Sequence, residues 1–278
     1  MKKSLPKEKK TKLQAVAVNH SLNKLDVLFA SGKKNILNIY CTAGFPQLED
    51  TGKVMLALQE NGTDIIELGI PYSDPIADGP VIQQSNMQAI ENGIGIGKIF
   101  EQLKEIKDRL RVPVILMGYL NPVMQYGIEN FCREAAAMGV AGIILPDMPL
   151  YEYEKIYQPI FAKFGLHFIF LISPQTSDKR IRLADKLSKG FIYAVSSSAT
   201  TGTDADSSHQ EAYFNHIKNM KLINPVLIGF GIKDKETFEF ACRFAAGAII
   251  GSAYIKALAH TDSISETTAH FIGQIKNL

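Results

Sequence analysis

Eight short apolar runs, separated by helix-like segments, recur from residue 35 to the C-terminus. They are rich in Ile, Val and Leu and bounded by Gly, Pro or Asp, which is typical of parallel strands buried on both faces. Eight strand–helix units without a Gly/Pro-rich linker favour a closed (β/α)8 barrel of the TIM type over an open doubly wound sheet. The predicted strands are ILNIYCT (36–42), DIIELGI (64–70), VPVILMGY (112–119), VAGIILPD (140–147), LHFIFLIS (166–173), FIYAVSS (191–197), PVLIGFG (225–231) and AGAIIGSA (246–253).

The segments between the runs predict helices. Asn61-Gly62 is a credible stop for the helix after the first strand, since glycine readily takes the left-handed conformation that ends a helix. In residues 97–110 one apolar stripe is opposed by Lys and Glu. Its members are Ile99, Phe100, Leu103, Ile106 and Leu110.

The connection after the second strand is longer than a βα loop requires, so it predicts a functional lid or an extra helix. The glycines of GIGIGK (93–98) resemble a nucleotide-binding loop but follow a helix rather than a strand, which favours a helix stop and a turn. His167, inside an apolar strand, is expected to be a core residue.

Charge and length set limits on the domain organisation. The 278 residues suit one barrel, and a net charge of +2 gives no bulk electrostatic case for nucleic acid or an anionic membrane. No apolar run approaches the ~20 residues of a membrane span. The excess positive charge lies in residues 1–20, which we expect to form a basic, disordered extension before a barrel domain of residues 21–278.

The cysteines and histidines give no metal signal. Cys41, Cys132 and Cys242 are widely separated, and neither CxxC nor HExxH spacing occurs. We therefore expect reduced, mostly buried thiols in a cytoplasmic protein without a metal site.

Glu67 is the strongest catalytic candidate, because it lies at the end of the second strand among Ile65, Ile66, Leu68 and Ile70. In a barrel the active site lies at the carboxyl ends of the strands. A carboxylate in such apolar surroundings should have a raised pKa, which suits a general acid and base near neutrality. The alternative is a structural glutamate paired with a core Arg or Lys.

Two further carboxylates follow in the next loop, at Asp74 and Asp78. Asp-Pro and Asp-Gly pairs are ordinary turn formers, so either residue could be purely structural. Their position on the rim beyond Glu67 favours a functional role, because two carboxylates in different environments can hold different protonation states.

Glycines at the ends of the last two strands predict a phosphate site. Gly231 in GFGI (229–232), Gly251 and Ser252 fall where barrels bind phosphate through backbone N–H groups. Gly202, beyond the sixth strand, could complete this site.

Taken together, these motifs resemble the tryptophan synthase alpha subunit family. The resemblance runs from about residue 23 to the end of the chain, and ELGIPYSDPIADGPVIQ (67–83) is its most specific part. It also includes MGYLNPVMQYG (117–127), ILPDMP (144–149), SPQTSDKRI (173–181) and GFIYAVS (190–196).

The resemblance implies cofactor-free retro-aldol cleavage of indole-3-glycerol phosphate to indole and glyceraldehyde 3-phosphate. Glu67 would transfer the protons, and Asp78 would hydrogen-bond the indole N–H. The matching positions imply an indole pocket of Tyr40, Tyr119 and Tyr193 and a phosphate site of Gly202, Gly231, Gly251 and Ser252.

The resemblance also implies a partner, a beta subunit that carries pyridoxal phosphate and receives the indole within an alpha2beta2 heterotetramer. Asp74 and Pro75 would lie at that interface. The chain departs from the family at Ala199-Thr200-Thr201-Gly202, where Gly-Val-Thr-Gly is usual, and at Ala245-Ala246-Gly247, where Ala-Asp-Gly is usual.

Two other functions stay open on the sequence. A non-catalytic activator would keep the fold and the beta-binding surface, and the altered loop after the sixth strand is its only support. The other function is that of another phosphate-binding barrel of aromatic amino-acid synthesis, such as an isomerase. Such a function does not explain the DPIADGP loop (74–80).

Overall fold

Nine parallel strand segments form one sheet in the computed structural model, which describes residues 22–195, 206–229 and 231–276. The expected extension of residues 1–20 lies outside these ranges. The strand order is β5-β4-β3-β2-β1-β9-β8-β7-β6. The strands are β1 (Ile36–Thr42), β2 (Ile65–Gly69), β3 (Val114–Met117), β4 (Gly142–Ile144), β5 (His167–Phe168), β6 (Leu171–Ile172), β7 (Ile192–Val195), β8 (Val226–Gly229) and β9 (Gly247–Ile250).

The two ends of this order are halves of one predicted strand, residues 166–173, and this closes the barrel. β5 pairs with β4, whereas β6 pairs with β7. Between them, Ile169 N–H still donates to Ile143 O at 3.0 Å, while Phe170 O already accepts from Tyr193 N–H at 3.1 Å. The strand therefore changes partners midway, and the predicted eight-stranded barrel is confirmed.

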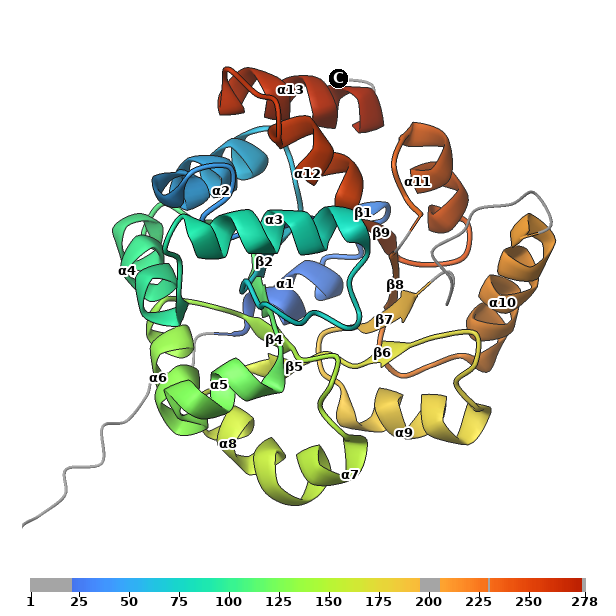
Figure 1. The fold of residues 1–278 in the computed structure, drawn as a ribbon. Helices are drawn as coiled ribbons and strands as arrows, with labels where there is room; N and C mark the ends of the chain where they lie inside the picture. Colours follow the sequence, from blue (N-terminus) through green and yellow to red (C-terminus); the bar gives the residue numbers. More distant parts are fainter. Residues whose placement is uncertain (1–21, 196–205, 230, 277–278) are drawn as a thin grey trace, which may run out of the picture.

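Helices surround the strands as a ring (Figure 1). Two of them, α3 and α4, follow β2 in succession. The helices are α1 (Lys24–Ala30), α2 (Thr51–Glu60), α3 (Pro80–Glu91), α4 (Ile96–Ile106), α5 (Leu120–Tyr126), α6 (Ile128–Ala137), α7 (Leu150–Glu152), α8 (Gln158–Lys163), α9 (Asp178–Leu187), α10 (Asp206–Met220), α11 (Lys235–Cys242), α12 (Ser252–Leu258) and α13 (Ile264–Lys276), with a 3-10 turn at Leu48–Asp50 and a π-helical turn at Tyr153–Tyr157.

The predicted helix signals agree with these bounds. The apolar stripe of α4 is buried, and Gly62 follows α2 with φ +90°. Gly93, with φ +94°, lies between α3 and α4, so the glycine run 93–98 is a helix stop and a turn. No described helix has both the length and the apolar character needed to cross a membrane.

The short helix α1 covers the amino end of the barrel. Asn23 caps it by accepting from Leu25 N–H, and its amide donates to Ala141 O at 2.8 Å. Leu25 is fully buried there. His167 Nε2 lies 2.8 Å from Asp26 Oδ1, so the histidine is a core residue with a polar partner, as expected.

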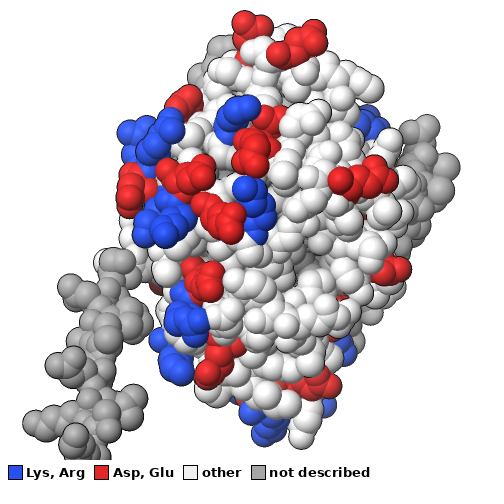
Figure 2. Space-filling view, turned by 60° about the vertical axis from the view of Figure 1, so that its left-hand side comes forward, with Lys and Arg blue, Asp and Glu red and all other residues white. Residues whose placement is uncertain are grey.

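The surface visible in Figure 2 mixes charges of both signs, with Lys and Arg next to Asp and Glu. A polyanion is bound by a patch of one sign. Such a patch is not seen among the described residues on this face.

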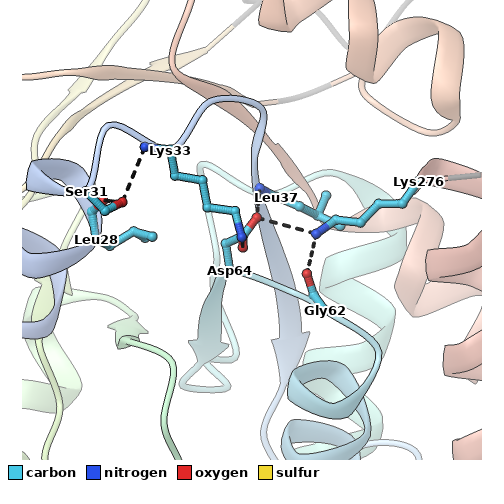
Figure 3. A network of polar contacts seen from close by, with 7 residues as sticks. All are labelled: Leu28, Ser31, Lys33, Leu37, Gly62, Asp64 and Lys276. Carbon is cyan, nitrogen blue, oxygen red and sulfur yellow. Dashed lines mark hydrogen bonds and ion pairs between the residues drawn. The ribbon is translucent and has the colours of Figure 1, made fainter. Parts of the chain in front are cut away.

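A buried aspartate joins distant segments at the amino end of β2 (Figure 3). Asp64 is only 6% exposed, and its Oδ1 lies 2.5 Å from Lys33 Nζ. Its Oδ2 accepts from Leu37 N–H at 2.9 Å and lies 3.5 Å from Lys276 Nζ, at the end of α13. Lys276 also donates to Gly62 O. One carboxylate thus ties the start of the barrel to its last helix.

We expect Asp64→Asn to lower the free energy of unfolding by about 2 kcal/mol, because it weakens charge-assisted hydrogen bonds to a buried group. Urea unfolding at neutral pH measures the change. Asp108→Asn is the matched control, since Asp108 is exposed, and it should change stability by less than about 0.5 kcal/mol. Equal effects of the two substitutions would contradict the structural role of Asp64.

Candidate active site

A cavity of about 460 Å³ opens at the carboxyl ends of the strands. Parallel strands bring their ends to one side of the barrel, so residues far apart in sequence meet there. Seven of the predicted site residues line it, namely Tyr40, Glu67, Asp78, Tyr193, Gly231, Gly251 and Ser252.

Glu67 lies at the base of this cavity and is 1% exposed. On β2 it is the register partner of Tyr40 on β1, so both side chains project from the same face of the sheet. Burial raises the pKa of Glu67 to about 8; a hydrogen bond from Asn38 opposes this, and the nearby charge of Asp78 adds to it. At neutral pH the group is therefore mainly a carboxylic acid, close to the point where it releases its proton.

The alternative of a structural ion pair is not supported. No Lys, Arg or His lies within 4.0 Å of the Glu67 carboxyl among the described residues. The hydrogen-bond partner is the neutral amide of Asn38, whose Nδ2 donates to Glu67 Oε2 at 2.9 Å. A neutral partner leaves the carboxyl free to titrate.

Asp78 occupies a turn on the rim above Glu67. Its backbone N–H donates to Pro75 O at 3.2 Å, and the Tyr119 hydroxyl donates to its Oδ2 at 3.2 Å. The backbone N–H of Ala77 in turn donates to that hydroxyl at 3.0 Å. Burial raises the pKa of Asp78 to about 6, and the hydrogen bond from Tyr119 opposes the rise. Near neutrality Asp78 is mainly ionised while Glu67 is mainly protonated.

The rings of Tyr40 and Tyr193 occupy space left free by glycines on the neighbouring strands. A Cβ on Gly69 would lie 2.5 Å from Tyr40 Cζ, and a Cβ on Gly229 would lie 2.6 Å from Tyr193 Cζ. Both contacts are too short for real atoms, so only glycine lets each ring lean across the next strand. Burial raises the pKa of both phenols well above the usual value, so both stay neutral.

Tyr119 takes a different place from the other two tyrosines. It packs against Tyr72, with ring centroids 5.2 Å apart, and its hydroxyl bonds Asp78. It does not appear among the described residues that line the cavity. Its hydroxyl adjoins the cavity through Asp78, which does line it.

The cavity ends in the turns that follow β8 and β9. Gly231 has φ +74°, a backbone conformation that favours glycine, and Gly251 immediately precedes α12. Ser252 begins that helix and lines the cavity. Gly202 lies outside the described residues.

Several residues at this site carried no clear signal in the sequence. Lys233 and Lys256 line the cavity, as do Ile82, Met117, Ile249 and Phe271. The two lysines could have been found from their spacing, since Lys233 directly follows GFGI and Lys256 lies one helical turn after Ser252. Asn38 has a usable signal as well, since it is a polar residue two positions before Tyr40 on a mainly apolar strand.

The loop after β2 carries the two predicted interface residues. Asp74 is exposed and accepts from the Ser73 hydroxyl at 2.5 Å. Pro75 is buried, and the adjacent Ile76 is 86% exposed. The loop thus presents a charged and an apolar side chain to solvent at the rim of the cavity.

Comparison with known proteins gives a consistent result. The family model described as "Tryptophan synthase alpha chain" matches residues 5–277. The chain is 49% identical over 244 residues to the tryptophan synthase alpha chain of Flavobacterium johnsoniae, covering 87% of this chain and 96% of that one. It is 47% identical to that of Christiangramia forsetii, covering 87% and 94% of the two chains.

Solved structures agree with these relatives. The tryptophan synthase alpha chain of Legionella pneumophila superposes with a TM-score of 0.81 at 32% identity, covering 92% of this chain and 97% of that one. A chain of the tryptophan synthase complex from Pyrococcus furiosus gives 0.79 at 32% identity, covering 88% and 99%. The chain therefore belongs to the tryptophan synthase alpha chain family.

Proposed function

We propose that the cavity cleaves indole-3-glycerol phosphate to indole and glyceraldehyde 3-phosphate, with Glu67 as the proton-transfer group and Asp78 as the group that stabilises charge. The observation that carries this proposal is that Glu67 and Asp78 line one cavity, where burial raises the pKa of Glu67 to about 8 and that of Asp78 to about 6. One donates a proton, and the other offers a negative charge. We assign this activity to a catalytic domain of residues 21–278, with residues 1–20 as an extension.

The reaction begins with a proton on Glu67. Its transfer to carbon 3 of the indole ring converts the ring into an indoleninium-like electron sink. The Glu67 carboxylate then removes the proton of the adjacent glycerol hydroxyl, and the aldehyde C=O forms. The carbon–carbon bond breaks as its electrons return to the ring, which releases indole and leaves Glu67 protonated again. This carbon–carbon lyase step needs proton transfer and charge stabilisation, both of which side chains of this cavity can supply.

Asp78 acts on the other side of the ring. Protonation at carbon 3 places positive charge on the ring nitrogen, and an ionised Asp78 accepting from the N–H stabilises that charge as it forms. The Tyr119 hydroxyl and the turn at Pro75 hold the aspartate in place. The positive charge on the ring nitrogen is thus stabilised by an Asp78 carboxylate that is already oriented toward it.

The remaining cavity residues bind the two ends of the substrate. Tyr40 and Tyr193 offer aromatic faces to the indole ring. Gly231, Gly251 and Ser252 offer backbone N–H groups and a hydroxyl to the phosphate, with Lys233 and Lys256 adding positive charge nearby. Gly202 is a further candidate for this phosphate site.

The chain has no cofactor of its own, and pyridoxal phosphate belongs to the beta subunit of tryptophan synthase. We propose that the chain works with that subunit in an alpha2beta2 heterotetramer in the cytoplasm, passing indole to it. The exposed Asp74 and Ile76, with Pro75 between them, support a docking role for the loop after β2.

The non-catalytic activator remains the competing function. Its only support is the sequence of residues 199–202 after β7, which lies outside the described residues. The convergence of Glu67 and Asp78 on one cavity favours the enzyme, because an activator has no use for a buried, protonated glutamate.

The test is a steady-state assay of the full chain with indole-3-glycerol phosphate, with indole and glyceraldehyde 3-phosphate both quantified. We expect the two products in equal amounts from the chain alone and at a higher rate with a beta subunit present. No products under either condition, together with stimulation of the beta reaction, would establish the activator instead.

The pH dependence of cleavage should be bell-shaped, with limbs near pH 6 and pH 8 from Asp78 and Glu67. Activity falls below the acid limb because Asp78 loses its charge, and above the alkaline limb because Glu67 loses its proton. Tyr119→Phe removes a hydrogen bond that lowers the pKa of Asp78, so the acid limb should move to higher pH.

The measurement is kcat/KM from about pH 5 to pH 9.5. Tyr151→Phe is the control, since Tyr151 is 70% exposed. The two limbs of its pH profile should lie at the same pH values as those of the unaltered chain. An acid limb unmoved in Tyr119→Phe would mean that another group produces it.

A further inference from the structure

Asn38 is a polar residue on an otherwise mainly apolar strand, and it lies next to Glu67 without lining the cavity. It precedes Tyr40 by two positions on β1, so both side chains project from the same face. Asn38 is fully buried and is absent from the residues around the cavity. Its one side-chain hydrogen bond among the described residues runs from Nδ2 to Glu67 Oε2 at 2.9 Å.

The other half of the Asn38 amide has no partner. Its Oδ1 is buried and receives no hydrogen bond from any described residue. Buried polar atoms are almost always paired, and those that are not call for a functional explanation. Among the described residues, only the donor side of the amide is engaged, and its partner is Glu67.

A neutral amide suits a carboxyl group that must gain and lose a proton. A lysine or arginine in the same place would hold Glu67 as a fixed carboxylate. The Asn38 N–H group can hydrogen-bond Oε2 whether or not Oε1 carries the proton. It therefore restrains the orientation of the carboxyl group without fixing its charge.

We infer that Asn38 is the positioning residue of Glu67: it holds Oε2 from within the barrel and leaves Oε1 to exchange the proton with the substrate. The inference rests on the proposed role of Glu67 for its catalytic consequence, but the contact itself is independent of that role. The direction of the pKa effect agrees, since this hydrogen bond lowers the pKa of Glu67 against the larger effect of burial.

The test compares Asn38→Leu with Asn86→Leu in the full chain. Asn86, on α3, is the matched control, because it is 2% exposed, also has a buried Oδ1 without a partner among the described residues, and does not line the cavity. The first readout is the titration of the Glu67 carboxyl carbon by ¹³C NMR, assigned by difference from Glu67→Gln. It reports on the contact whether or not Glu67 is catalytic.

In Asn38→Leu the midpoint of the Glu67 titration should rise from about 8 by about one pH unit or more, because the Glu67 carboxylate has lost the hydrogen-bond donor of Asn38. Cleavage should lose about 10-fold or more in kcat with little change in KM, since Asn38 does not reach the substrate. The alkaline limb of kcat should move upward with the midpoint. Asn86→Leu should leave the midpoint and the limb unchanged.

The outcomes are distinguishable. An unchanged NMR midpoint in Asn38→Leu overturns the inference, whatever happens to activity. A raised midpoint with an unmoved rate limb supports the contact but removes Glu67 from the role proposed above. If the leucine variant does not fold, Asn38→Val provides the same test, because valine is smaller, suits a strand and has no donor.

Discussion

Replacing Glu67 with glutamine should abolish indole formation, with a loss of at least about 10³-fold in kcat. Glutamine keeps the size of the side chain and can still accept from Asn38, but it carries no transferable proton. The fold should therefore survive while the chemistry stops. Indole release under saturating substrate is the measurement, and turnover at the unaltered rate would refute the role of Glu67.

The same substitution should make the folded chain more stable at neutral pH. The pKa of Glu67 is raised from 4.5 to about 8 by folding, so the unfolded chain releases this proton at lower pH than the folded chain does. The contribution of Glu67 to the free energy of unfolding is therefore fully present below pH 4.5 and is lost as the pH rises toward 8. Glutamine does not titrate, so the free energy of unfolding of Glu67→Gln should exceed that of the unaltered chain by about 3 kcal/mol at pH 7.

Urea unfolding at several pH values tests this second effect. The gain should vanish near pH 4 and grow up to about pH 8. Glu105→Gln, at an exposed position on α4, is the control and should show no such growth. A gain that does not depend on pH would mean that burial does not raise the pKa of Glu67.

Asp78→Asn should lower kcat by about 10²- to 10³-fold, the effect of removing one preorganised group that stabilises charge in the transition state. Asparagine keeps an oxygen that can accept from the ring N–H and from Tyr119, so KM should change little. Only the negative charge is lost, and that charge matters when the ring becomes positive. Steady-state kinetics of the full chain separate kcat from KM.

The pH profile of this variant provides a further check. The acid limb should disappear because asparagine does not titrate. The alkaline limb should move to lower pH, since the charge of Asp78 helps to raise the pKa of Glu67. Asp108→Asn is again the matched control. A variant that loses activity but keeps both limbs would assign the acid limb to another group.

Much of the barrel could be predicted from local patterns. The predicted strand 36–42 coincides with β1, and the helix predicted over 97–110 corresponds to α4, which spans Ile96–Ile106. Apolar runs and helical stripes indicate burial directly, because the residue type at each position depends on whether that position is buried or exposed. The prediction for 140–147 was longer than β4, since apolar residues beyond Ile144 pack in a loop without pairing.

The candidate site was predictable only in part. The position of Glu67 at a strand end and the glycines of the last two strands marked the correct end of the barrel. The proximity of Tyr119 to Asp78 left no trace in the sequence, because 41 residues separate them and neither lies in a periodic pattern that implies the other.

The sequence by itself determined the fold class, the family and the chemical types at the site, because these follow from local patterning and from one specific motif. The tertiary structure alone decided which groups meet: Asn38 with Glu67, Tyr119 with Asp78, and the exchange of strand partners between β5 and β6. The reason is physical. A pKa and a hydrogen bond depend on distances across neighbouring strands, and strand register sets those distances only once the barrel has closed.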